Sequence, residues 1–347
     1  MTNKIIDFLR EHKLPIVVFL FSFAMMQGLA FTMFNNYTES MSPDALNYMK
    51  MAQGDFNLEP IQKYRVIIPM LAAGLDFVFG GVFEKIRPWS FEGDFSLFVS
   101  FWIVNTFVMA LFSTVTYLLC RAYNISVIAS LFGLLTIFSC RWTAYMAGLP
   151  IVDSLFCLTS VLVLLAIKTK DKGLLIFCIL VGPWTKESFI FVAPVIFFFG
   201  PVKKIPQIGW FILSGLLVFS FRIYFDRYTN STLSESFHKD FDHLGNFYFA
   251  VHRLFSFHGL YELFSIVGLW VLLPLWVAIT ATKWLTEKFR TLDKFIYAYL
   301  ACVLVQAMIS AELARMLYLA LPVFALCIAR LIDRYVSSEP GFSGLKN

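Results

Sequence analysis

Hydrophobic residues in this chain fall in long blocks instead of alternating with polar residues. The blocks are bounded by charged or helix-breaking stretches and cover residues 15–34, 95–119, 125–139, 151–167, 173–199, 206–224, 259–281, 295–311 and 313–331. An α-helix needs about 20 apolar residues to cross the hydrocarbon core of a bilayer, and these blocks approach or reach that length. The pattern predicts an all-α, polytopic transmembrane bundle and not a β-barrel.

The block 173–199 is too long for one clean crossing. Its middle contains Gly182, Pro183, Lys186 and Glu187 in the sequence GPWTKES. Helix breakers and charges at membrane depth are tolerated where they are buried in protein or line a cavity. We therefore predict two short helices that meet at this sequence, which brings the number of crossings to about ten.

Residues 64–83 are also apolar, but Pro69, Asp76 and several glycines interrupt them. We predict an interfacial or re-entrant segment here and not a span. With this placement, the termini and the loops on their side hold 16 Lys and Arg against 7 Asp and Glu. Positive charge in short loops marks the cytoplasmic side, so both termini are predicted to be cytoplasmic.

Two large segments face the outer side in this topology, residues 35–94 and 225–258. We expect the first to carry short interfacial helices. The chain has no tandem repeat and no low-complexity linker, which predicts one transmembrane domain over residues 1–347. Because the large loops lie on one side, chemistry is expected at the outer face.

The composition excludes a water-soluble enzyme. Hydrophobic residues make up 59% of the chain and charged residues only 15%, with a mean hydropathy of +0.73, whereas soluble domains carry about 25% charged residues. The basic start before the first block has no cleavage site after it and indicates an uncleaved signal anchor. In the absence of a CxxC pair, a Walker loop and a dinucleotide fingerprint, we expect no disulfide, no cofactor and no nucleic-acid partner.

The first outer segment contains candidate catalytic residues. The sequence MSPDALNYMKMAQG predicts a surface helix over residues 43–53, with Asp44 in its first turn and Tyr48 on the same face. A helix N-terminus favours the ionised carboxylate that a general base must have, although Asp44 could equally serve only the helix dipole. Tyr64 and Arg65 follow in KYRVIIP, where an arginine either marks the headgroup level or binds a phosphate.

Other ionisable residues lie at the outer ends of predicted spans. Arg141 precedes GLPIVDSLF, in which Asp153 opens a span on the side of Lys186 and Glu187, so that Asp153 and Lys186 either pair or contact a substrate. Glu312 and Arg315 are three residues apart and form either a local ion pair or an acid and a base facing one cavity. His238, His243, His252 and His258, with Asp240 and Asp242, match no metal-ligand spacing, which favours a solvated loop.

Taken in order, these motifs resemble the membrane-embedded GT-C glycosyltransferases. They are an acidic residue followed by xxxYxxMA, then YRxxxP, then LPxxD at the start of a span, and then KE between half-helices. The closing sequence ExxRMLYLALP is similar to a segment of GT-C-like bacterial glycan transferases and polymerases. The resemblance implies transfer of a sugar from a polyprenyl-phosphate carrier to a glycan, lipid or protein acceptor at the outer face of a bacterial inner membrane.

On this resemblance, Asp44 matches the catalytic carboxylate, and Lys186, Arg315 and Arg65 match groups that hold the lipid phosphate. The sugar and acceptor site would be shaped by Tyr48, Tyr64, Asp153, Glu187, Glu312 and Arg141. Asp44 has no second acid beside it, so a divalent metal is left open. Alternatives are a polysaccharide polymerase or ligase with a diphosphate-linked glycan donor, a lipid or glycan transporter, and a non-catalytic subunit. A transporter is disfavoured because only one broken helix is predicted.

Overall fold

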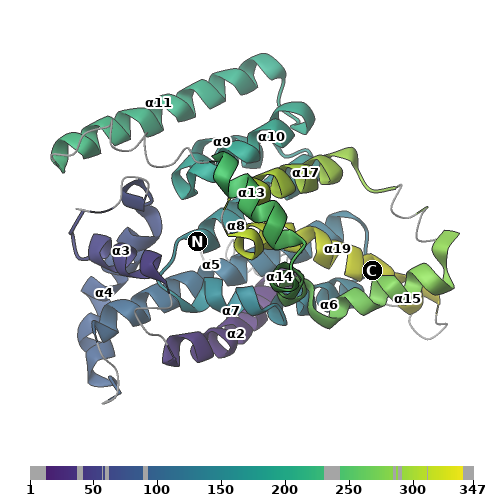
Figure 1. Cartoon of the computed structure of the whole chain (residues 1–347), viewed down its shortest axis with the longest axis horizontal. Helices are drawn as coiled ribbons and strands as arrows, with labels where there is room; N and C mark the ends of the chain where they lie inside the picture. The colour runs from purple at the N-terminus through teal and green to yellow at the C-terminus, as the bar shows by residue number, and fades with distance from the viewer. Residues whose placement is uncertain are drawn as a thin grey trace, which may run out of the picture.

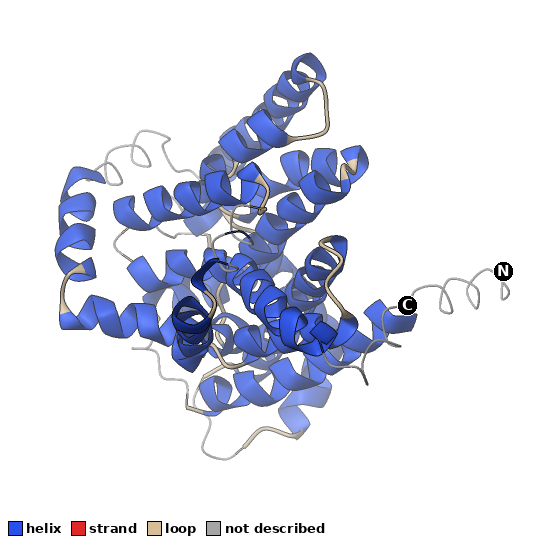
Figure 2. Cartoon of the chain, turned by 90° about the vertical axis from the view of Figure 1, so that its right-hand side faces the viewer, coloured by secondary structure: helices blue, strands red, loops and turns tan. Residues whose placement is uncertain are grey.

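The structure is a computed structural model that describes residues 13–36, 42–56, 58, 62–88, 93–229, 243–283, 287, 291–310 and 312–338. Every element within these residues is helical (Figure 2), so the predicted all-α class is confirmed. The α-helices and 3-10 helices (η), labelled as in Figure 1, are α2 (Lys13–Asn35), α3 (Pro43–Ala52), η2 (Gln62–Tyr64), α4 (Ile67–Lys85), α5 (Phe95–Ala122), α6 (Val127–Phe138), α7 (Arg141–Gly148), α8 (Asp153–Thr169), α9 (Lys172–Thr185), η3 (Glu187–Phe191), α10 (Ala193–Phe199), α11 (Lys204–Tyr228), α13 (His243–Leu254), α14 (Phe257–Val267), η4 (Gly268–Val271), α15 (Leu272–Thr280), α17 (Lys294–Ile309), α18 (Leu313–Leu317), η5 (Tyr318–Ala320) and α19 (Leu321–Ser338).

Six helical segments of the described chain are long and apolar enough to cross a membrane: α2, α4, α5, α11, α14 to α15, and α18 to α19. The pair α6 and α7 would make a seventh, although it bends by 72° at its break. The chain is therefore a helical membrane protein, as predicted. The count of ten spans is not confirmed, because several predicted spans form helices that are short or bent.

α2 and α5 run antiparallel and fix where the segment between them begins and ends. The ring of Phe34, near the end of α2, lies 5.9 Å from that of Phe95 at the start of α5, and Gln27 donates to Thr106 at 2.7 Å. The segment between the end of α2 and the start of α5 therefore begins and ends at the same level of the helix bundle. A single crossing by α4 would need another crossing before it, for which the 10 residues of α3 are too few. The placement of 64–83 outside the spans stays a prediction, because α4 is itself long and apolar enough to cross.

The internal structure of α4 differs from the prediction of a re-entrant segment. α4 is one continuous helix of 19 residues. Pro69 does not interrupt it, because the proline lies in the first turn, where a backbone N–H has no helical partner. At Gly80 a Cβ would lie 3.4 Å from the Ser96 hydroxyl of α5 and closer still to Asp76. The distance to Ser96 is an ordinary van der Waals contact, so Gly80 makes room for the Asp76 side chain of its own helix and does not break the helix.

The break predicted at GPWTKES is confirmed. Lys186 alone separates α9 from η3, and its backbone is extended, with φ −166° and ψ 144°. Gly182 permits the chain to fold back, since a Cβ at this position would collide with the ring of Phe189. At the far end, Gly200 lies against Leu175. α9 and α10 therefore form a helical hairpin with Lys186 at its tip.

The core among α5, α6, α8 and α19 holds the start of α8 in place. The side-chain amide of Asn105 on α5 donates to the carbonyl oxygens of Leu149 at 2.8 Å and Ile151 at 3.0 Å, and it accepts a hydrogen bond from Ser154 at 2.6 Å. These bonds satisfy the buried backbone between α7 and α8, where no helix supplies partners. Asp153, the first residue of α8, is thereby fixed in position.

A polar cluster lies at the opposite end of α8. The hydroxyl of Tyr123 donates to Asp293 at 2.7 Å, and the Lys168 ammonium lies 2.9 Å from the same carboxylate and 3.8 Å from the centre of the Tyr123 ring. Partial burial opposes ionisation of Asp293. The hydrogen bonds from Lys168 and Tyr123 outweigh this effect and hold the pKa of Asp293 below its usual range.

We expect this cluster to make stability depend on pH in the acid range. Because the folded-state pKa of Asp293 is depressed, its contribution is present above the unfolded pKa of about 3.9 and is lost as the pH falls through the folded value. The side chain is 40% exposed, which limits the effect to about 0.2–1 kcal/mol. Unfolding in detergent between neutral and acid pH should show a loss of stability that is smaller in Asp293→Asn. An equal loss in both proteins would contradict this assignment.

Candidate functional site

Arg315 is the centre of a charged cluster built from segments far apart in the sequence. Its Nη1 lies 3.0 Å from Asp44 and 2.7 Å from Glu312, and its Nη2 contacts Asp153. The Arg315 side chain is only 4% exposed, and its buried Nε has no hydrogen-bond partner among the described residues. A guanidinium whose Nε–H is not used by another described residue is suited to donate to a further anionic oxygen.

Asp153 joins Arg315 to the tip of the α9–α10 hairpin. The Lys186 ammonium lies 2.7 Å from Asp153 Oδ1, and both side chains are buried. The structure thus forms the ion pair that the sequence left as one of two options. Removing one partner of such a buried pair costs about 3–5 kcal/mol, because the remaining charge stays uncompensated. Through Lys186 and Arg315, Asp153 therefore joins α8 to the hairpin and to α18 at one point.

α3 carries Asp44 into this cluster. The surface helix predicted over 43–53 forms as Pro43–Ala52 and ends just before Gly54, whose φ of 88° favours glycine. Asp44 Oδ1 accepts a hydrogen bond from Gln62 at 2.6 Å, while Oδ2 faces Arg315. The Asp44 side chain is 25% exposed, so its carboxylate keeps a route to water.

A second set of polar groups adjoins the first at the neighbouring residues Lys186 and Glu187. Arg65 donates to the Tyr48 hydroxyl at 2.9 Å and to Glu187 at 3.0 Å, and Arg222 lies 3.2 Å from the same carboxylate. Burial is the main effect that raises the pKa of Tyr48 to about 12, and nearby Arg65 acts against it. Tyr48 is therefore neutral at physiological pH.

Tyr64 lies beside this second set and is held by residues that sequence reasoning did not single out. Its hydroxyl donates to Asp226 at 2.8 Å, Lys63 lies 2.5 Å from the same carboxylate, and Arg222 lies 4.5 Å from the centre of the Tyr64 ring. Arg222 and Asp226 are four residues apart near the end of α11. That spacing places them on one helix face and could have indicated both.

Arg141 is the one predicted site residue that makes no contact with either set of polar groups among the described residues. Its guanidinium donates to the Tyr261 hydroxyl at 2.7 Å, at an exposed position on α7. Of the histidine-rich segment, His238, Asp240 and Asp242 lie outside the described residues, and His258 contacts Arg253. Within the described part of the chain, no three His, Cys, Asp or Glu side chains are grouped so that they could hold a metal ion.

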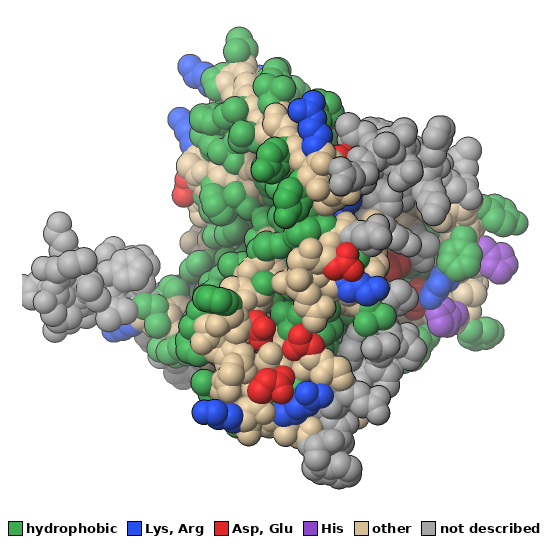
Figure 3. All heavy atoms as spheres, turned by 90° about the vertical axis from the view of Figure 1, so that its left-hand side faces the viewer, with side chains coloured by type: hydrophobic (Ala, Val, Ile, Leu, Met, Phe, Trp, Pro, Cys, Tyr) green, Lys and Arg blue, Asp and Glu red, His purple; other side chains and the backbone are tan. Residues whose placement is uncertain are grey.

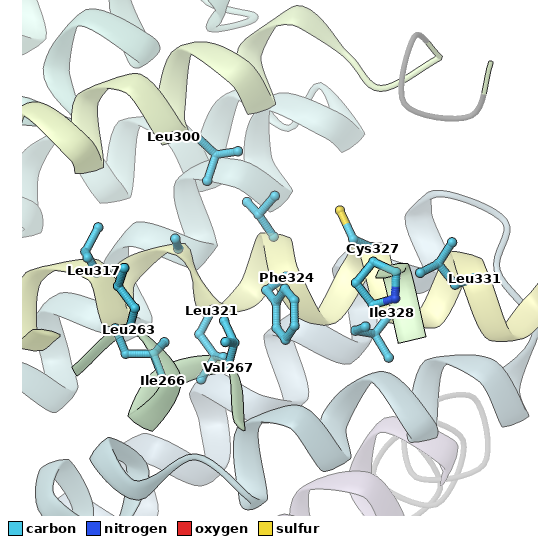
Figure 4. A pocket seen from close by; sticks show the side chains of 13 residues that line it. Leu263, Ile266, Val267, Leu300, Leu317, Leu321, Phe324, Cys327, Ile328 and Leu331 are labelled. Atoms are coloured by element: carbon cyan, nitrogen blue, oxygen red, sulfur yellow. The ribbon is translucent and has the colours of Figure 1, made fainter. Parts of the chain in front are cut away.

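An apolar pocket of about 470 Å³ has Leu317, two residues after Arg315 in the chain, among its lining side chains. Its walls come from α14, α15, α17 and the segment from α18 to α19. Figure 4 shows side chains from Leu317 to Leu331 along this segment, with Leu300 opposite them. Leu317 follows Arg315 by two residues, so the two side chains leave the helix in different directions. The pocket and the charged cluster therefore lie on different faces of α18.

The end of the molecule that carries α3 and α4 exposes charge next to apolar surface. Figure 3 shows acidic and basic side chains gathered in one part of this face, beside a broad apolar area. Phe77 of α4 is 92% exposed, and Phe79 and Val82 are exposed as well. Apolar side chains that are open to the surroundings beside charged groups are typical of a protein face at a membrane interface.

Comparison of the chain with protein-family models, with curated proteins and with solved structures gave no match in any of the three. We therefore argue its function from the residues of the site.

Proposed function

We propose that this protein is an inverting membrane glycosyltransferase. It would move a sugar from a polyprenyl-phosphate donor to a glycan, lipid or protein acceptor at the non-cytoplasmic face of a bacterial inner membrane. The observation that carries the proposal is the chain of contacts from Asp44 through Arg315 and Asp153 to Lys186, in a bundle of apolar helices. Ionisable groups are costly within a membrane and mark functional sites there.

The cations of the site suit the leaving group of this reaction. When the bond between sugar and phosphate breaks, the phosphate gains negative charge. Arg315, Lys186 and Arg65 would then stabilise the transition state more than the ground state, because their attraction grows with that charge. The Nε of Arg315 offers a donor that no described residue uses.

Asp44 suits the role of general base. It is part of the cluster, yet its side chain is 25% exposed, so an acceptor hydroxyl could reach its carboxylate. The carboxylate would take the proton as the acceptor oxygen attacks the anomeric carbon. Asp153 and Glu312 share Arg315 with Asp44, and Tyr48, Glu187 and Tyr64 lie in or beside the adjoining second set of polar groups. These side chains would shape the sugar and acceptor site.

The donor can be identified without knowledge of the acceptor. Purified protein in lipid nanodiscs would be given polyprenyl-monophosphate sugars and, separately, diphosphate-linked oligosaccharide lipids, each together with a cell-envelope extract that supplies the acceptor. The carrier released above the level of the extract alone would be measured by mass spectrometry. Release of polyprenyl phosphate would support the proposal. Release of the diphosphate carrier would favour a polymerase or ligase, and binding of a donor without any release would favour a transporter or a non-catalytic subunit.

The apolar pocket predicts where part of the lipid chain lies. Ala320→Trp would fill the pocket, whereas Leu304→Trp changes an exposed position of the neighbouring α17. A lipid chain displaced from the pocket moves into a bilayer that is equally apolar, so it loses only its packing contacts with the protein. We therefore expect the affinity for undecaprenyl phosphate to fall about three- to tenfold in Ala320→Trp and to stay unchanged in Leu304→Trp. Equal affinities of both variants in a nanodisc binding assay would exclude the pocket from donor binding.

A further inference from the structure

The three carboxylates around Arg315 differ in their access to water. The Asp153 side chain is 4% exposed, that of Asp44 is 25% exposed, and that of Glu312 is 52% exposed. Asp153 also compensates the buried Lys186. Three carboxylates therefore surround two cations, which leaves one negative charge in excess within this group.

An anion that binds to Arg315 has to displace a carboxylate or bear its repulsion. Asp153 cannot leave, because its departure would strand Lys186 as a buried charge without a partner. Glu312 and Asp44 can turn towards water, and pairs with such exposed carboxylates contribute little to stability. The exposures thus divide the carboxylates into one permanent partner of Arg315 and two that can be replaced.

We propose that Asp44 and Glu312 are exchangeable resident anions of Arg315, and that the phosphate of the lipid carrier takes their place. This inference rests on the proposed function and adds an order of events to it. In the resting site, Arg315 occupies Oδ2 of Asp44. Binding of the phosphate frees that oxygen, so the general base becomes available only after the donor has bound.

Gln62 keeps Asp44 in position during the exchange. Its amide nitrogen donates to Oδ1 of Asp44 at 2.6 Å, and its amide oxygen accepts a hydrogen bond from Asn47, which fixes the orientation of the amide. Asp44 therefore has two different contacts, one to an uncharged side chain of its own segment and one to the cation that the phosphate competes for. Only the second is lost when the donor binds.

The test is the affinity for undecaprenyl phosphate in lipid nanodiscs. Asp44→Asn and Glu312→Gln each remove the charge of one resident anion and keep its shape. If these anions compete with the phosphate, each variant binds undecaprenyl phosphate about three- to fivefold more tightly than the unchanged protein. Asp293→Asn is the matched control, because this carboxylate is ion-paired with Lys168 at the far end of α17 and should leave the affinity unchanged.

Undecaprenol, which has the same chain and no phosphate, separates the outcomes. Tighter binding of undecaprenyl phosphate by the two variants, with unchanged binding of undecaprenol, supports the exchange. Unchanged or weaker binding of undecaprenyl phosphate by both variants overturns the exchange and leaves the proposed function intact, provided that the unchanged protein prefers the phosphate over undecaprenol. A protein that does not prefer the phosphate overturns both proposals. Tighter binding of both lipids by the variants indicates a general loosening and also overturns the exchange.

Discussion

Replacing Asp44 by Asn should lower the rate of sugar transfer by about 10²–10⁴-fold, the usual loss when a general base is removed. Asn has nearly the same shape as Asp, and its side-chain oxygen can still accept the hydrogen bond from Gln62, but it cannot take up the acceptor's proton. The position is partly exposed, so the substitution leaves the buried pair of Asp153 and Lys186 in place. The measurement is kcat with the donor that the nanodisc assay identifies.

Donor affinity distinguishes this loss from a failure to bind. We expect Asp44→Asn to be nearly inactive while it binds the donor at least as tightly as the unchanged protein. Glu262→Gln is a suitable control, because it removes a carboxylate that pairs with Arg253 and makes no bond to Arg315 among the described contacts. Full activity of Asp44→Asn would remove Asp44 from the reaction.

Replacing Asp153 by Asn should have the largest effect on stability. Arg315 and Lys186 would stay buried without their common carboxylate, and removing one partner from a buried charge pair costs about 3–5 kcal/mol. Adding Lys186→Met to Asp153→Asn should recover part of this loss, because the Lys186 charge that had lost its carboxylate is then gone. Unfolding in mixed detergent micelles gives the free energies for both proteins and for the unchanged chain.

Asp293→Asn provides the scale for this comparison. It also removes an ion-paired carboxylate, but a 40% exposed one, and should cost about 0.2–1 kcal/mol. A similar small value for Asp153→Asn, or no recovery in the double variant, would mean that water reaches the cluster and compensates its charges. The activity of Asp44→Asn thus tests the role of the cluster in the reaction, and the stability of Asp153→Asn tests its role in holding the fold together.

Much of the architecture could be predicted from the hydrophobic blocks alone. Each predicted block is helical in the structure, as one helix or as several in succession, and the break at Lys186 occurs where Gly182 and Pro183 indicate it. The number of spans could not be predicted in this way, because hydropathy does not show whether a helix bends, as between α6 and α7, or lies along another, as α4 lies against α5. Those features depend on helix packing and on loops that return to the same level.

The site shows the same division. The cost of ionisable groups in apolar surroundings singled out Asp153 and Lys186 from the sequence, and helix ends and helix spacing singled out Asp44 and Arg315. The sequence offered the pairs of Asp153 with Lys186 and of Glu312 with Arg315. It could not offer the contact between Arg315 and Asp44, which joins residues 271 positions apart. Lys63, Arg222 and Asp226 escaped notice because each stands near the end of an apolar segment, where a charge is normally solvated.

The sequence by itself therefore determined that this is an all-helical membrane protein, and it pointed to the charged side chains Asp44, Asp153, Lys186 and Arg315 that the structure brings together. The first of these properties follows from the transfer of single residues between water and hydrocarbon, which depends on local composition. Only the tertiary structure decided that Arg315 pairs with three carboxylates, of which one is buried and two are accessible to water. Such differences arise from burial by distant segments, and burial is a property of the packed bundle.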